Sequence, residues 1–342
     1  MGVIFLKNVN NVLMIILGTL IGAGFASGKE VYLFFGKYDK LGLLGIVFSA
    51  LFIIYIIYKV LKIIKKENID NYFELLEKIN NNHSKTNRLM QEIVDSFLLV
   101  SFFIMVAAFS AYLKQLWKIP IYISSGIFVL LCYIVFSKDL QGVLKINSIL
   151  VPFILVFIVL LGIKSIKNTN IEIISERKWN FLISCILYTS YNSIILIPIL
   201  ACMKQHIKTK KDIILISTLS GIFIILFALI IFFMLQSQIN LTKNFEMPIL
   251  EIVKPIGKKY VYVYSFIIIA SIFTSAISTG FSFLKSTSKT KKEYNQNLIL
   301  MCILSIFVSK IGFSKLVQCL YPFFGILGIL QILLLCKMYL KK

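Results

Sequence analysis

The sequence predicts an all-α membrane protein with ten transmembrane helices, and three observations support this prediction. Hydrophobic residues make up 58% of the 342 residues. Apolar runs of about 20 residues, the length that crosses a bilayer, recur along the whole chain. Lysines lie mainly between these runs, as is typical of loops beside a membrane, so the net charge of +21 does not indicate nucleic acid as a partner. We therefore expect one integral membrane domain over residues 1–342.

The predicted spans cover residues 9–36, 41–63, 91–116, 119–137, 144–164, 180–203, 211–236, 259–285, 294–310 and 314–339. The first and the sixth contain residues that a plain spanning helix does not favour. Because these two interrupted spans each open a set of five, the chain divides into halves over residues 9–164 and 180–339. An odd number of spans in each half requires the halves to be inverted relative to each other, with a binding site where the two interrupted spans meet.

The first span is interrupted by residues 18–30, which contain four glycines followed by Lys29 and Glu30. Glycine weakens a helix by about 1 kcal/mol relative to alanine, and a charge at the bilayer centre costs at least about 2.5 kcal/mol. Irregular backbone at this depth persists only where it is buried in protein or lines a cavity. The segment therefore predicts a broken helix that offers main-chain groups to a ligand. Close packing of small residues between helices is the alternative, because the glycines also form pairs four residues apart.

Two loops are predicted to contain helices of their own. Apolar residues recur at helical spacing over residues 68–80, with acidic residues between them, which indicates an amphipathic helix at the inner membrane face. In the outer loop 243–258, Pro248 suits the first turn of a helix, and Pro255 with Gly257 ends it. This short helix is either a lid over the binding site or an ordinary loop helix.

The distribution of basic residues predicts the orientation in the membrane. When both termini are placed in the cytoplasm, the inner loops contain more Lys and Arg residues than the outer loops.

The sixth span has a polar centre over residues 188–193, with five hydroxyl side chains and one amide. Such side chains satisfy backbone groups that local unwinding sets free, and they can also face a solute. We therefore expect the sixth span to be unwound here, opposite the break in the first span. Pro198 adds a kink point.

Three motifs give the chain a family resemblance: Gly-Thr-Leu-Ile-Gly-Ala-Gly-Phe-Ala-Ser-Gly-Lys-Glu at 18–30, Leu-Tyr-Thr-Ser-Tyr-Asn at 187–192 and Phe-Thr-Ser-Ala-Ile-Ser at 273–278. In a ten-span context the chain resembles the LeuT-type amino acid/polyamine/organocation transporters, and in particular the bacterial YkvI-like membrane proteins. The resemblance covers the whole chain. It implies a five-plus-five inverted repeat with helices 1 and 6 unwound around the substrate.

The resemblance also implies which residues meet an amino-acid-like substrate. The main chain of the first break would meet the substrate carboxylate, and the sixth span would supply the facing wall. The residues are Leu20, Gly22, Ala23, Gly24, Phe25 and Ser27 of the first span and Tyr188, Ser190, Tyr191 and Asn192 of the sixth.

Sodium-coupled members of the family hold an ion between helix 1 carbonyls and helix 8 oxygens. The matching groups here are the carbonyls of Gly18 and Ile21 and the hydroxyls of Ser271, Thr274 and Ser275. The three hydroxyl positions share one helical face, and oxygen ligands suit a hard cation. The alternative is that these hydroxyls bond the carbonyls of their own helix or a neighbouring helix.

The coupling ion stays open between sodium and a proton. Phe25 stands where some members of the family have an amide ligand for a second sodium ion, so a second site is not expected. Glu30, at the end of the break, is a candidate proton carrier. Sodium is the sole cofactor that we expect.

The sequence contains no catalytic motif, so we do not expect an enzyme. We expect a multi-pass protein of the cell membrane, with both termini cytoplasmic, that transports a small amino acid or related amine by sodium- or proton-coupled symport. A solute sensor that kept the fold without transport is one alternative, and a structural subunit of a membrane complex is another. The oligomeric state and the identity of the substrate stay open.

Overall fold

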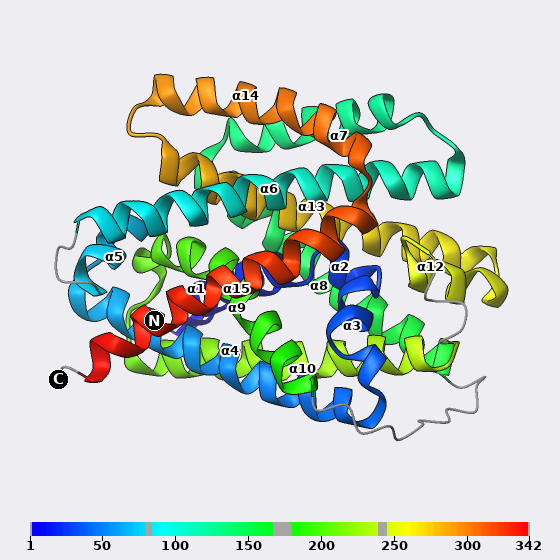
Figure 1. Cartoon of the computed structure of the whole chain (residues 1–342), viewed down its shortest axis with the longest axis horizontal. Helices are drawn as coiled ribbons and strands as arrows, with labels where there is room; N and C mark the ends of the chain where they lie inside the picture. Colours follow the sequence, from blue (N-terminus) through cyan, green and yellow to red (C-terminus); the bar gives the residue numbers. More distant parts are fainter. Residues whose placement is uncertain (1, 80–83, 167–179, 239–244, 341–342) are drawn as a thin grey trace.

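A computed structural model describes residues 2–79, 84–166, 180–238 and 245–340 (Figure 1). Every regular element within these ranges is a helix. The long helices are α1 (Gly2–Leu20), α4 (Asp39–Glu67), α6 (Ser84–Trp117), α7 (Ile121–Phe136), α8 (Asp139–Ile166), α9 (Phe181–Ala201), α10 (Lys210–Gln236), α13 (Lys258–Thr287), α14 (Lys291–Val308) and α15 (Phe313–Leu340). The short helices are α2 (Ala23–Ala26), α3 (Lys29–Phe34), α5 (Tyr72–Ile79) and α12 (Pro248–Val253), with 3-10 turns at Gly36–Tyr38, Lys204–His206, Lys254–Ile256 and Ser309–Ile311.

Eight helices of the described residues are long and apolar enough to cross a membrane, and Asn8–Leu20 and Ile121–Phe136 are shorter apolar helices. Large apolar side chains such as Leu130 of α7 and Phe307 of α14 are exposed on outward faces, as expected beside lipid. These features confirm a multi-pass, all-helical membrane protein. The count of ten spans stays a prediction.

Local signals in the sequence account for where several helices begin. Thr209 caps α10 in a reciprocal pair of hydrogen bonds with Asp212, and Thr290 does the same for α14 with Glu293. Pro248 stands in the first turn of α12, as predicted, where its missing N–H costs nothing. The boundaries of the helices therefore follow from short-range chemistry.

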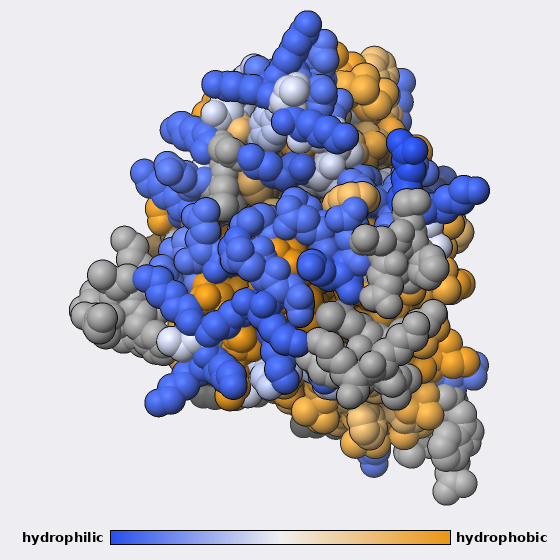
Figure 2. All heavy atoms as spheres, turned by 90° about the vertical axis from the view of Figure 1, so that its left-hand side faces the viewer, coloured by the Kyte–Doolittle hydropathy of each residue, from blue (hydrophilic) through white to orange (hydrophobic). Residues whose placement is uncertain are grey.

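The long helices run roughly along the long axis of the molecule, with α5 and both chain ends toward one end and α12 at the other (Figure 1). We call these the α5 end and the α12 end. α1 lies inside the bundle and packs against α8, α9, α10 and α13. α9 packs against α4 and α15, and α6 packs against α13. Viewed from the α5 end, hydrophilic residues gather over the middle of the face and hydrophobic residues lie along its right-hand margin (Figure 2).

The structure corrects one prediction about the fold, the unwinding of the sixth span. α9 is a continuous helix from Phe181 to Ala201. The Asn192 side chain donates to the carbonyl oxygen of Tyr188 at 2.9 Å, and the Ser193 hydroxyl donates to that of Thr189 at 2.6 Å. Because Asn192 and Ser193 bond carbonyl groups one turn earlier in the same helix, these two side chains are satisfied without opening the backbone.

Candidate substrate and ion site

The first span is interrupted twice, and each interruption lies against a different helix. α1 ends at Leu20, Gly22 is extended before α2, and Gly28 has a left-handed φ of 81° before α3. Left-handed backbone favours glycine. A Cβ atom added to Gly22 would lie 2.7 Å from Ser275 Oγ of α13, and one added to Gly28 would lie 2.9 Å from Ile249 Cγ1 of α12. The close approach of another helix therefore requires glycine at both interruptions.

Glu30 is buried beside these interruptions, with 3% of its surface exposed. Its carboxyl accepts a hydrogen bond from the hydroxyl of Tyr191 in α9. Gly24 leaves room for it, since a Cβ atom there would lie 2.6 Å from Glu30 Oε2. Across the described residues, no basic side chain lies within ion-pair distance of this carboxyl. A buried carboxylate without a positive partner is costly, so the site suits a proton or a cationic ligand at Glu30.

Lys29 is adjacent to Glu30 in the sequence but has different partners. Its Nζ donates to the carbonyl oxygen of Phe245 at 3.1 Å, and its charge acts on Glu246. Burial raises the pKa of the Glu246 carboxyl, although the backbone N–H of Ser314 and the charge of Lys29 oppose this effect. Lys29 therefore connects α3 to the segment before α12 and does not neutralise Glu30.

Three buried aromatic rings, those of Phe34, Tyr188 and Tyr321, pack around Tyr191, whose hydroxyl meets Glu30. Tyr191 is stacked between Phe34 of α3, with ring centroids 5.4 Å apart, and Tyr321 of α15, with centroids 4.7 Å apart. Tyr188 meets Tyr191 edge-on at 5.6 Å. Both faces of the Tyr191 ring are thus covered by other rings. The buried carboxyl and its apolar surround together favour a cationic or apolar group over an anion.

The hydroxyls predicted to bind sodium lie against the end of α1. Ser275 Oγ donates to the carbonyl oxygens of Gly18 at 2.8 Å and Thr19 at 3.2 Å. Thr274 Oγ1 instead donates to the carbonyl oxygen of Ser271 in its own helix, at 3.1 Å. Ser271 Oγ is fully buried and has no hydrogen-bond partner in the part of the chain that the structure describes. The structure thus brings one of the three predicted hydroxyls, that of Ser275, to the Gly18 carbonyl, and these are oxygen donors of the kind that sodium prefers.

Asn147 of α8 lies next to the same end of α1 and is not among the site residues predicted from the sequence. Its Nδ2 donates to the carbonyl oxygen of Val143 at 2.9 Å and lies 3.5 Å from Ser278 Oγ. Its Oδ1 is buried against Gly18 and lacks a hydrogen-bond partner among the described residues. The available signal was a lone amide inside an apolar span. Tyr321 of α15 is a second residue of the site that was not predicted, and the available signal was an aromatic residue beside Pro322 inside an apolar span.

α12 covers the second interruption at the α12 end. The backbone N–H of Ile249 donates to the carbonyl oxygen of Ser27 at 3.1 Å. Gln115 of α6 donates to Glu251 Oε1 at 2.8 Å. The hydroxyl of Ser27 donates to the carbonyl oxygen of Gly24 at 3.1 Å, so it stabilises the local turn. These contacts place α12 against the second interruption, and the choice between a lid and an ordinary loop helix stays a prediction.

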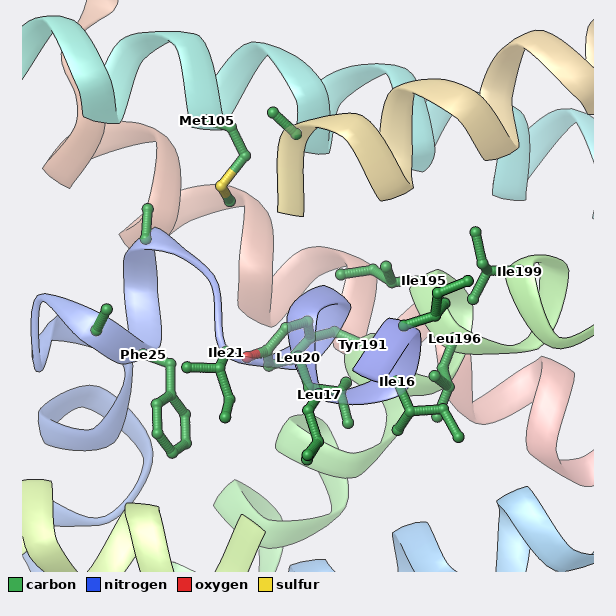
Figure 3. Close-up of a cluster of buried hydrophobic side chains, with 14 of the residues drawn as sticks. Ile16, Leu17, Leu20, Ile21, Phe25, Met105, Tyr191, Ile195, Leu196 and Ile199 are labelled. Atoms are coloured by element: carbon green, nitrogen blue, oxygen red, sulfur yellow. The ribbon is translucent and has the colours of Figure 1, made fainter. Parts of the chain in front are cut away.

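Figure 3 shows how other predicted residues lie around the first interruption. Tyr191 points its hydroxyl toward the end of α1 near Leu20 and Ile21, whereas the ring of Phe25 points away from it (Figure 3). Met105 of α6 reaches toward the interruption, and its Cε would lie 3.7 Å from a Cβ atom on Gly22. These side chains form an apolar enclosure around the break.

The predicted residues of α9 divide between two directions. Tyr188, Tyr191 and Asn192 are spaced to share one helical face, and their side chains reach the Glu30 region. The carbonyl of Ser190 lies against Gly328 of α15, and its hydroxyl is buried with no hydrogen-bond partner within the described ranges. The structure therefore brings three of the four residues to Glu30.

Comparisons with known proteins show what the chain is similar to. No protein-family model matches the sequence. The protein YyaD of Bacillus subtilis (strain 168) is 26% identical over 327 residues, which cover 93% of this chain and 93% of YyaD. The membrane protein YkvI of the same organism is 22% identical over 330 residues, which cover 94% of this chain and 93% of YkvI.

Three solved structures share the fold. MhsT in complex with L-phenylalanine has a TM-score of 0.70 and 15% identity over 93% of this chain and 86% of MhsT. A Na+-coupled sialic acid symporter in a substrate-bound outward-open state has a TM-score of 0.63 and 15% identity over 94% and 75% of the two chains. Mhp1, a nucleobase-cation-symport-1 family transporter with bromovinylhydantoin bound, has a TM-score of 0.63 and 11% identity over 94% of this chain and 74% of Mhp1.

None of these three structures is an enzyme, in agreement with the prediction from the sequence. Sodium coupling in the sialic acid symporter is consistent with sodium as the expected cofactor. The chain is therefore similar to the membrane protein YkvI over nearly its full length, and it has the fold of these three solved structures.

Proposed function

We propose that the chain is a secondary active transporter of a small amino acid or related amine, driven by a sodium or proton gradient through alternating access. The observation that carries this proposal is the broken first span, where the Glu30 carboxyl is buried without a positive partner among the described residues and the α1 end lies against the hydroxyl of Ser275. Breaks of this kind in a membrane helix expose backbone groups for a ligand. The substrate would bind between α1, α2, α6, α9 and α13.

The finer architecture belongs to the same proposal. Ten spans would form two inverted halves over residues 9–164 and 180–339, with both termini and the α5 end in the cytoplasm. The main chain from Leu20 to Gly24 would meet the substrate, and the face of α9 with Tyr188, Tyr191 and Asn192 would lie opposite. One bundle would rock against the rest to expose the site to each side in turn.

The coupling ion has two candidate positions. Sodium would bind at the Gly18 carbonyl with Ser271 and Ser275, supported by the 2.8 Å approach of Ser275 Oγ to that carbonyl and by the unpartnered Ser271 hydroxyl in the described structure. A proton would bind at Glu30, supported by the burial of this carboxyl. The two positions lie on different helices, so variants can separate them.

Uptake into proteoliposomes tests the proposal. The purified full chain is reconstituted, and labelled L-amino acids and primary amines are supplied under an imposed sodium gradient, a proton gradient or neither. We expect at least one gradient to drive accumulation above the external concentration. Saturable binding without any flux would instead support a sensor, and neither binding nor flux across the panel would overturn the proposal.

A further inference from the structure

The chemistry around Glu30 identifies the kind of substrate group that this site accepts. The carboxyl is 3% exposed and accepts a hydrogen bond from Tyr191. The titratable side chains that face it are Tyr188 and Tyr191 from α9 and Tyr321 from α15. All three tyrosines are neutral at physiological pH in water and are not expected to supply a positive charge.

Lys29, the one basic residue of α3, has partners other than Glu30. Lys29 Nζ donates to the Phe245 carbonyl and acts on Glu246 at the α12 end. The described ion pairs of the molecule do not include Glu30. The positive charge that balances an ionised Glu30 must therefore come from outside the described protein, as a proton or as part of a ligand.

The aromatic rings favour an organic cation over an inorganic one. Tyr191 is stacked between Phe34 and Tyr321, and Tyr188 lies edge-on to it. Because Phe34 and Tyr321 cover both faces of Tyr191, the rings offer an apolar surround next to the carboxyl, which suits the carbon chain attached to an ammonium group. Sodium would need several oxygen ligands in place of this apolar surround.

On the basis of the proposed transport function, we propose that Glu30 binds either a proton or the ammonium group of the substrate, so that the chain exchanges a proton for a protonated amine. In the exchange, the O–H bond of the Glu30 carboxyl breaks and its proton leaves to water on the open side. The carboxylate then pairs with the incoming ammonium group, and no other bond changes. The proton-bound form and the ammonium-bound form of Glu30 both carry no net charge at this position. Either form can therefore be buried in the protein, as the Glu30 carboxyl is buried in this structure. The empty ionised form would be a bare buried charge, so it does not cross between the two open states.

Proton release on binding tests this exchange directly. The purified full chain in weakly buffered detergent solution, with a pH-sensitive dye, is mixed with n-butylamine, 1,4-diaminobutane or L-leucine. We expect an amine to bind more tightly as the pH rises and to release close to one proton for each molecule bound. Glu30→Gln should bind the same amine at least about tenfold more weakly and release no proton, because the neutral side chain mimics the protonated carboxyl.

Matched variants keep the test independent of folding. Asp95→Asn, which removes a half-buried carboxyl of α6 away from the break, should release the same proton as the unmodified protein. If Glu30→Gln does not fold, Tyr191→Phe keeps the stacked ring and removes the hydrogen bond to Glu30. It should weaken amine binding in a protein that still unfolds cooperatively, at a somewhat lower melting temperature.

The outcomes separate this inference from the proposed function. Gradient-driven uptake of L-leucine that Glu30→Gln retains, or amine binding that releases no proton, would overturn the exchange and leave transport in place. No proton release and no thermal shift with any probe between pH 5 and pH 9 would also overturn it. Proton release without flux in proteoliposomes would support the site and count against transport.

Discussion

At the scale of single residues, Lys29 and Glu30 show how far adjacent charges can separate in a fold. Lys29 reaches the carbonyl of Phe245, whereas Glu30 meets Tyr191. Neighbouring positions on a helix point about 100° apart, so the sequence predicts that these two side chains do not pair. Their actual partners lie more than 150 residues away in the chain. The sequence therefore identified both charges as unusual without identifying what each one contacts.

Ser275 provides a test at the same scale. Ser275→Ala removes the hydroxyl that lies 2.8 Å from the Gly18 carbonyl. We expect the sodium concentration that half-maximally raises the melting temperature to increase about tenfold, a loss of about 1.4 kcal/mol of binding free energy. Ser282→Ala is the matched control, because the Ser282 hydroxyl bonds the carbonyl of Ser278 in its own helix. Equal sodium dependence in the two variants would contradict the assignment.

At the scale of helices, the contact between α9 and α15 depends on small residues. A Cβ atom added to Gly328 would overlap the backbone carbonyl of Ser190, and one added to Gly325 would lie 3.0 Å from the carbonyl oxygen of Leu187. Backbone atoms cannot move aside as a flexible side chain can. Glycine therefore allows α15 to approach α9 closely, as small residues do between membrane helices, and this approach brings Tyr321 onto Tyr191.

A pair of glycine variants tests this packing. Gly328→Ala should destabilise the protein by about 1–3 kcal/mol through overpacking, measured as a lower melting temperature in detergent. Gly126→Ala in α7 is the control, since a Cβ atom there meets nothing within 4 Å. Alanine at this helical position should be neutral or stabilise by up to about 1 kcal/mol. Similar melting temperatures for the two variants would argue against tight packing at Gly328.

At the scale of the whole molecule, the distribution of lysines predicts which end lies in the cytoplasm. Basic residues such as Lys285 and Lys289 lie near the α5 end and line a cavity of about 880 Å³ there with Asp95 of α6. The positive-inside rule places such residues on the cytoplasmic side. The short helix α12, at the opposite end (Figure 1), would then face the outside.

Cysteine labelling tests this orientation. In a background without the native cysteines, Lys258→Cys in the first turn of α13 and Lys289→Cys just after the helix replace exposed lysines at its two ends. A membrane-impermeant maleimide applied to intact cells should label Lys258→Cys and should label Lys289→Cys only after permeabilisation. The reverse pattern would invert the proposed topology.

The sequence by itself determined the helical membrane class, the ranges of the long helices, the short helix α12 and the break before Lys29. Each of these depends on hydropathy, glycine, proline or capping residues within one or two helical turns. Only the tertiary structure decided that α9 stays continuous, that Asn147 lies beside Gly18, and that Tyr321 stacks on Tyr191 next to Glu30. These features depend on which distant helices pack together, and no local rule contains that information. The polar centre of α9 illustrates the difference, because its residue types allow an unwound or a continuous helix. In the continuous helix, Asn192 and Ser193 satisfy their own turns, while Tyr191 reaches Glu30 across the bundle.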